Sequence, residues 1–176
     1  RGMARPSTDP KLQGLDPREV FRHQGILTEQ FLELYAYAHV MDLRRKGRLN
    51  PSGEVVIGWD PRDTVGTFTA AAVRGIRKGG ARALVVGVLP TPAVILYLLY
   101  RRAASALMIT ASHNPADQNG VKLFLGPLGL KPLPADDRSL TALIDSLDYQ
   151  AIHFLQEVGC LEMARKEALE VFQVHA

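Results

Sequence analysis

The stretch that decides the fold is "EVVIGWDPRDTVGTFTAAAVRGIRKGGARALVVGV", residues 54–88. It opens with a short β-branched run at 54–58 that ends in a glycine turn, which is typical of a buried strand. Residues 66–80 follow with the composition of a helix closed by glycines, and 83–88 is a second apolar run. Strand, helix and strand in this order predict a parallel pair joined by a right-handed crossover.

The same alternation continues beyond this unit. A short apolar helix covers about 92–102, and "SALMIT" at 105–110 is a third strand. "GVKLFL" at 120–125 is a fourth, entered through Asn119-Gly120, a strong signal for a tight turn. Because the gap between the third and fourth strands is too short for a helical crossover, we expect the fourth to run antiparallel.

These elements predict an α/β fold: a three-layer α/β/α sandwich on a βαβαβ unit with an added antiparallel strand. A helix is expected before the unit, with Thr28 as its N-cap and Gly47 at its end. Another helix is expected over 136–147. The length of 176 residues suits one domain, or one domain and the start of another.

The sequence divides into three parts. Residues 1–20 are polar and rich in proline, and we expect a flexible N-terminal segment there. Residues 21–150 form the α/β domain, and 151–176 are interpreted as a linker and the first helix of a truncated second domain. The apolar face of that helix consists of Leu161, Leu169 and Phe172. With no strand after it, the helix is expected to pack on the first domain, to mediate self-association or to fray.

Composition favours a cytoplasmic globular protein. The hydrophobic fraction is 47% and the charged fraction 22%, and the net charge of +3 is not gathered in one block, which argues against a nucleic-acid partner. The single cysteine, Cys160, fits a reducing compartment. The longest apolar run, 93–100, is far below the roughly 20 residues that a membrane span needs. The N-terminus has no apolar signal-peptide segment.

The polar chemistry gathers in "ITASHNPADQNGVKLF" at 109–124. A serine, a histidine and an asparagine at 112–114 follow the third strand directly, and Lys122 lies in the fourth. Ligands of parallel α/β sheets bind beyond the carboxyl ends of the strands, so this loop stands where a site is expected. Arg62, from the loop after the first strand, could approach the same rim.

Spacing alone leaves an ordinary polar turn open for this loop, because Ser, Asn and Pro are turn residues. Two generic alternatives fail: Ser112 lacks the G-x-S-x-G elbow of hydrolases, and "RGIRKGGAR" at 74–82 is not a P-loop. The five histidines show no paired spacing of metal ligands. Asp60 and Asp63 are interpreted as turn and cap residues rather than ligands.

"TASHNPADQNGVK" resembles the phosphoserine loop of the α-D-phosphohexomutases, the phosphoglucomutases and phosphomannomutases, whose pattern is T-[AG]-S-H-N-P followed by N-G-x-K. Flanking segments agree in order. "VVIGWDPRDTVG" resembles the family's strand and G-x-D-x-R turn, with Trp59 where an arginine is usual. "GVLPTPA" matches its G-x-x-P-T-P segment, and "VFRH" resembles its opening F-R. The resemblance covers about residues 20–148, the first of the family's four domains.

The resemblance implies that Ser112 carries a phosphoryl group, gives it to a hexose monophosphate substrate and takes the other phosphoryl back from the 1,6-bisphosphate. Lys122 and His113 would be the acid/base and charge-stabilising groups. The implied cofactor is Mg²⁺, bound through the phosphate on Ser112, with its remaining ligands absent from this chain. The implied substrate- or phosphate-binding residues are Asn114, Arg22 and Arg62.

The chain departs from the family pattern in two ways. The family's D-I-R-G or G-x-R-G has no counterpart after Arg22, where "FRHQGILTEQ" passes directly to a helix cap. The D-G-D-x-D-R metal loop, the sugar-selecting loop and the terminal phosphate-binding loop are also missing. We therefore expect this chain alone to be inactive and to work with the remaining domains of the same enzyme. The alternative is a non-catalytic sugar-phosphate-binding or regulatory domain that retains the loop.

Overall fold

A computed structural model describes residues 4–50 and 53–175. Its main feature is a five-stranded sheet with the order β6-β5-β3-β4-β7. In chain order the strands are β3 (Glu54–Trp59), β4 (Arg82–Val88), β5 (Ser105–Ile109), β6 (Val121–Leu125) and β7 (Leu161–Met163). All neighbouring pairs are parallel except β5 and β6, which are antiparallel. The predicted βαβαβ unit and its added antiparallel strand are therefore confirmed.

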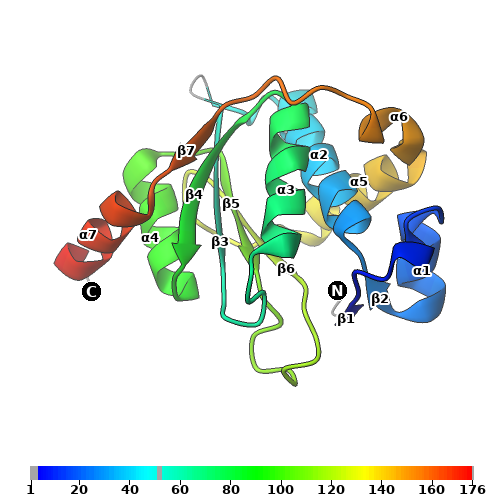
Figure 1. Ribbon diagram of the computed structural model, residues 1–176. Helices are drawn as coiled ribbons and strands as arrows, with labels where there is room; N and C mark the ends of the chain where they lie inside the picture. The colour runs from blue at the N-terminus through cyan, green and yellow to red at the C-terminus, as the bar shows by residue number, and fades with distance from the viewer. Residues whose placement is uncertain (1–3, 51–52, 176) are drawn as a thin grey trace.

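Helices cover both faces of the sheet, which gives the predicted three layers (Figure 1). One face carries α2 (Glu29–Arg45), α3 (Thr67–Lys78), α5 (Pro134–Ser146) and the short α6 (Tyr149–His153). The other face carries α4 (Thr91–Arg101) and α7 (Arg165–His175). No helix in the described ranges is long and apolar enough to cross a membrane.

The apolar core lies in two layers because successive strand residues face opposite sides of the sheet. In β3, Val55 and Ile57 pack in the layer beneath α2 and α3, whereas Val56 packs in the layer beneath α4. The central strand is thus buried on both sides, which explains its continuous β-branched sequence.

The close contact between α2 and α3 requires a glycine at position 75. A Cβ atom at Gly75 would lie 2.2 Å from the backbone oxygen of Glu33, so no larger residue fits at this point of contact. The start of α2 is as predicted: the Thr28 side chain accepts a hydrogen bond from the backbone N–H of Phe31. This close pair of helices forms one wall of the domain.

The N-terminal segment differs from the flexible lead-in predicted for residues 1–20. The strand β1 (Arg5–Pro6) pairs with β2 (Ile26–Leu27), and η1 (Pro10–Leu12) and α1 (Pro17–Gln24) lie between them. The side chain of Val20 is buried, so part of this segment is fixed by apolar packing. Sequence polarity did not reveal this, because the partner strand lies about twenty residues away. The first three residues of the predicted segment lie outside the described residues.

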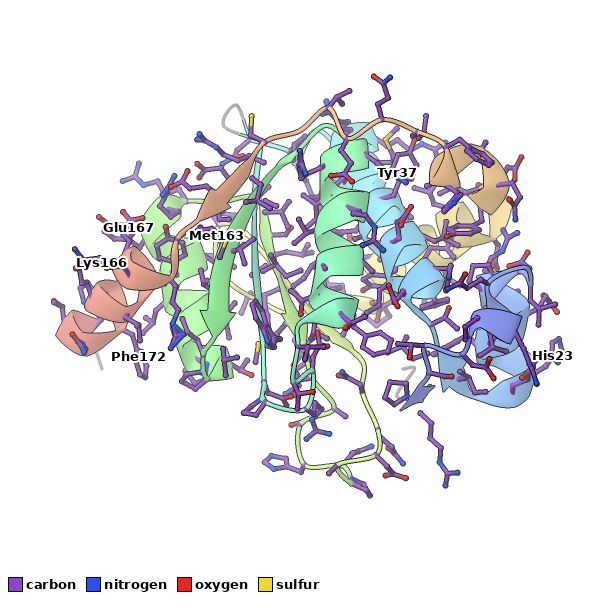
Figure 2. All side chains as sticks on the ribbon, in the orientation of Figure 1. His23, Tyr37, Met163, Lys166, Glu167 and Phe172 are labelled. Carbon is purple, nitrogen blue, oxygen red and sulfur yellow. The ribbon has the colours of Figure 1, made fainter. Side chains whose placement is uncertain are left out.

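The C-terminal segment also differs in detail from the prediction. Residues 161–163, expected to begin a helix, form β7 and extend the sheet beside β4. The following helix α7 packs against α4, with Ala168 and Val171 buried (Figure 1). Figure 2 shows Met163, Glu167 and Phe172 on this side of the molecule, opposite His23 on α1. Packing on the first domain is therefore the expectation that is confirmed, and self-association through this helix stays a prediction.

Candidate active site

The candidate site is the loop at 110–120, between β5 and β6. It lies beyond the carboxyl ends of the parallel strands and extends below the sheet in yellow-green in Figure 1. Thr110, where the loop begins, is buried, and the residues at 113–117 are exposed. The loop therefore has a fixed base and an accessible tip.

Ser112 adopts an unusual backbone conformation. Its φ is 59°, in the left-handed region that residues with a Cβ atom seldom occupy. Its backbone N–H donates a hydrogen bond to the Thr110 hydroxyl at 2.9 Å. Ser112 is half-buried, between the buried base of the loop and its exposed tip.

Lys122 reaches the serine from the neighbouring strand. Because β6 runs antiparallel to β5, Lys122 pairs in register with Met108 and returns to the base of the loop. Its Nζ donates a hydrogen bond to Ser112 Oγ at 3.0 Å. The structure thus brings together Ser112 and Lys122, to which the family resemblance assigns the phosphoryl carrier and an acid/base group.

His113 and Asn114 occupy the exposed tip beside the serine. The Asn114 side chain donates a hydrogen bond to the Gln118 side chain at 2.7 Å, which links the two ends of the tip. His113 follows Ser112 directly in an open position, where an incoming ligand could meet its ring.

Arg62 also reaches the loop, but it contacts backbone atoms. Nη2 donates to the Ser112 carbonyl and Nη1 to the Gln118 carbonyl, both at 2.9 Å. Nε donates to the carboxylate of Asp60, which also accepts a hydrogen bond from the Thr110 hydroxyl. Sequence reasoning did not include Thr110 among the site residues; its place before the serine was the available signal.

Arg22 is not brought to this loop. Its guanidinium pairs with Asp145 at the end of α5 and lies 4.0 Å from Glu19 on its own helix. The motif that suggested it, "VFRH", lies in α1. A match of two residues did not determine the position of the side chain.

The entry to β6 is not the tight turn predicted for Asn119-Gly120. The turns lie earlier, at 112–113 and 116–117. Asn119 is buried and forms a bridge with Ala4, in which each backbone N–H donates to the other's carbonyl. The N-terminal segment therefore lies against the base of the serine loop.

The carboxylates near the loop have structural roles, as predicted. Asp63 accepts hydrogen bonds from the backbone N–H groups of Phe68 and Thr69 and so holds the start of α3. Asp60 is occupied by Arg62 and Thr110. In the part of the chain that the structure describes, no group of three or more His, Cys, Asp or Glu could hold a metal ion. The residues around Ser112 therefore do not by themselves fit a Mg²⁺ site.

The chain belongs to a known family. Residues 14–151 match the family described as phosphoglucomutase/phosphomannomutase, alpha/beta/alpha domain I. The match includes the whole serine loop and the strands β3 to β6 of the sheet. This agrees with the three-layer fold.

Named relatives are mutases. A phosphomannomutase from Sinorhizobium fredii is 39% identical over 131 residues, which is 73% of this chain and 27% of that protein. A phosphoglucosamine mutase from Pelotomaculum thermopropionicum is 40% identical over 109 residues, which is 62% of this chain and 23% of that protein. The chain thus spans about a quarter of the length of these relatives.

A solved structure supports the fold. It is a phosphoglucomutase/phosphomannomutase family protein from Burkholderia thailandensis, with a TM-score of 0.65 and 24% identity. The similarity covers 82% of this chain and 31% of that one. At this identity the likeness concerns the arrangement of helices and strands.

Proposed function

We propose that this chain is the N-terminal domain of a phosphohexomutase that interconverts hexose 1-phosphate and hexose 6-phosphate through a phosphoserine at Ser112. One observation carries the proposal: Lys122 Nζ lies 3.0 Å from Ser112 Oγ, in the loop whose sequence matches the family pattern. A half-buried serine whose oxygen accepts a hydrogen bond from an ammonium group suits the role of phosphoryl carrier, because catalysis of this transfer rests on positioning and charge neutralisation.

In the proposed reaction the bond between Ser112 Oγ and phosphorus breaks as a sugar hydroxyl oxygen forms a new bond to phosphorus. The sugar hydroxyl loses its proton to the protein, and the protein delivers a proton to Oγ. Lys122 and His113 are the groups that accept and deliver these protons. The resulting 1,6-bisphosphate reverses its orientation in the site and returns its other phosphoryl group to the serine. Lys122 also offsets the charge that develops on Oγ.

The chain supplies part of the machinery. In our proposal Mg²⁺ would contact only the phosphate on Ser112 within this chain, and its other ligands would come from residues outside it. The isolated chain should therefore show no turnover. Asn114 is proposed to order the tip of the loop beside the substrate. The single cysteine makes the cytoplasm the expected location.

A non-catalytic binding domain is not favoured. Such a domain would need the loop but not the contact of Lys122 with the serine oxygen, which is present here. The relatives named above are also mutases rather than binding proteins.

The proposal is tested by the intact mass of the full-length protein and by its turnover of hexose 1-phosphates. We expect a mass increment of one phosphoryl group that disappears in Ser112→Ala together with turnover. Ser146→Ala is the matched control, because the Ser146 hydroxyl donates only to a carbonyl of its own helix. Retention of the increment or of turnover in Ser112→Ala would contradict the assignment.

A further inference from the structure

The tripeptide Asp-Pro-Arg occurs twice in the chain, at 16–18 and at 60–62. In both copies the aspartate side chain accepts a hydrogen bond from the backbone N–H of the arginine, at 2.9 Å in the first and 3.1 Å in the second. In both, the same carboxylate also accepts from the Nε atom of that arginine. The turn and the ion pair together fix the direction of the guanidinium.

The first copy shows what this arrangement does. Nη1 of Arg18 donates to the carbonyls of Ile144, Asp145 and Leu147, at 3.1, 3.0 and 2.8 Å. These carbonyls lie at the C-terminal end of α5, where the backbone carbonyls have no hydrogen-bond donors within the helix. The first copy is therefore a clamp that gathers the backbone carbonyls of a distant segment.

The second copy gathers the serine loop in the same way. Nη1 of Arg62 donates to the carbonyls of Asn114, Pro115 and Gln118, at 3.4, 3.2 and 2.9 Å, and Nη2 donates to the Ser112 carbonyl at 2.9 Å. The carbonyls of Ser112 and Gln118 lie on either side of the exposed tip, and those of Asn114 and Pro115 lie within it. Arg62 thereby holds the two ends of the loop together through hydrogen bonds to its backbone carbonyls.

A second link joins this clamp to the serine. The Asp60 carboxylate accepts from the Thr110 hydroxyl at 2.5 Å, and the Thr110 hydroxyl accepts from the backbone N–H of Ser112 at 2.9 Å. Ser112 is thus held at its N–H through Thr110 and at its carbonyl by Arg62. Contacts on both sides of the residue maintain its left-handed conformation, which is disfavoured for serine.

We infer that Asp60, Arg62 and Thr110 form a clamp that positions Ser112 for phosphoryl transfer, and that Arg62 is a positioning residue rather than a phosphate ligand. The inference rests on the proposed function for its catalytic consequence. The Arg62 side chain is only 15% exposed, and its donors are directed at Asp60 and the loop carbonyls. An incoming phosphate would have to break the loop's own contacts to bind it.

The two copies supply the test and its control. In the full-length enzyme, Arg62→Ala should lower kcat by about 100-fold with little change in KM, because the serine is misplaced while the substrate contacts remain. Arg18→Ala removes the same kind of clamp from α5 and should leave kcat within about twofold. A raised KM with unchanged kcat would show that Arg62 binds substrate and would overturn the inference. Equal losses of kcat in both variants would show a general loss of stability and would also overturn the inference.

Thr110 gives a second variant that leaves the arginine in place. Thr110→Val keeps the shape of the side chain but removes the hydroxyl, and it should lower kcat in the same way. Thr110→Ser keeps the hydroxyl and should restore most of the activity. If Thr110→Val is fully active, the link through Thr110 does not position the serine.

Limited proteolysis separates failure of the clamp from failure of the proposed function. A protease of broad specificity should cut Arg62→Ala within 113–118, while the wild-type protein and Arg18→Ala stay intact there. An uncut loop in Arg62→Ala would overturn the clamp. Turnover retained in Ser112→Ala would instead refute the phosphoserine proposal, and the proteolysis result would still decide whether Arg62 holds the loop.

Discussion

Replacing Ser112 with glycine should relieve the strain in the loop, whereas replacing it with alanine should leave the strain in place. The φ of 59° costs a residue with a Cβ atom roughly 1–2 kcal/mol relative to ordinary conformations. Glycine removes that cost but loses roughly 0.5–1 kcal/mol through the greater freedom of its unfolded chain. Both variants lose the hydrogen bond to Lys122 equally. We therefore expect Ser112→Gly to be more stable than Ser112→Ala by about 1 kcal/mol.

The measurement is urea unfolding of the 176-residue chain, monitored by circular dichroism. The free energies of unfolding of the two variants are compared where their m-values are equal. Ser139 provides the control, because it lies within α5 and its hydroxyl also makes one side-chain hydrogen bond, to Asp42. There the order should reverse, with Ser139→Gly less stable than Ser139→Ala by about 1 kcal/mol. If Ser112→Gly is also the less stable of its pair, Ser112 does not have a strained left-handed backbone, and the clamp has no strained conformation to maintain.

Three further predictions concern other parts of the molecule. In the full-length enzyme, Lys122→Met should lower kcat by about 10²- to 10⁴-fold with a smaller effect on KM; a purely raised KM would assign Lys122 to substrate binding alone. Burial lowers the pKa of His39 to about 4, whereas the unfolded side chain titrates near pH 6.5, so the unfolded state binds the extra proton between these values. The free energy of unfolding should therefore fall by up to about 3 kcal/mol as the pH drops from 6.5 to 4, and His39→Gln should remove this part of the slope. Backbone amides of α7 should be protected from hydrogen exchange in the monomer, because Ala168 and Val171 are buried against the sheet domain. Fast exchange confined to this helix would show that it frays.

Local patterns in the sequence determined the strands β3 to β6 and the loop that carries Ser112. The β-branched runs and the glycines that close them identified β3, α3 and β4, because these features act within one element. The short connection before β6 forced an antiparallel neighbour. That neighbour brings Lys122 back to Ser112.

The tertiary structure alone decided what the arginines and the two ends of the chain do. Arg62 could be placed at the rim from sequence, but only the folded loop directs four carbonyls at its guanidinium. Arg22 pairs with Asp145, more than a hundred residues away, and β7 pairs with β4 although its own sequence reads as helical. These outcomes depend on hydrogen-bond partners that are distant in the chain, and the periodicity of a segment carries no information about such partners.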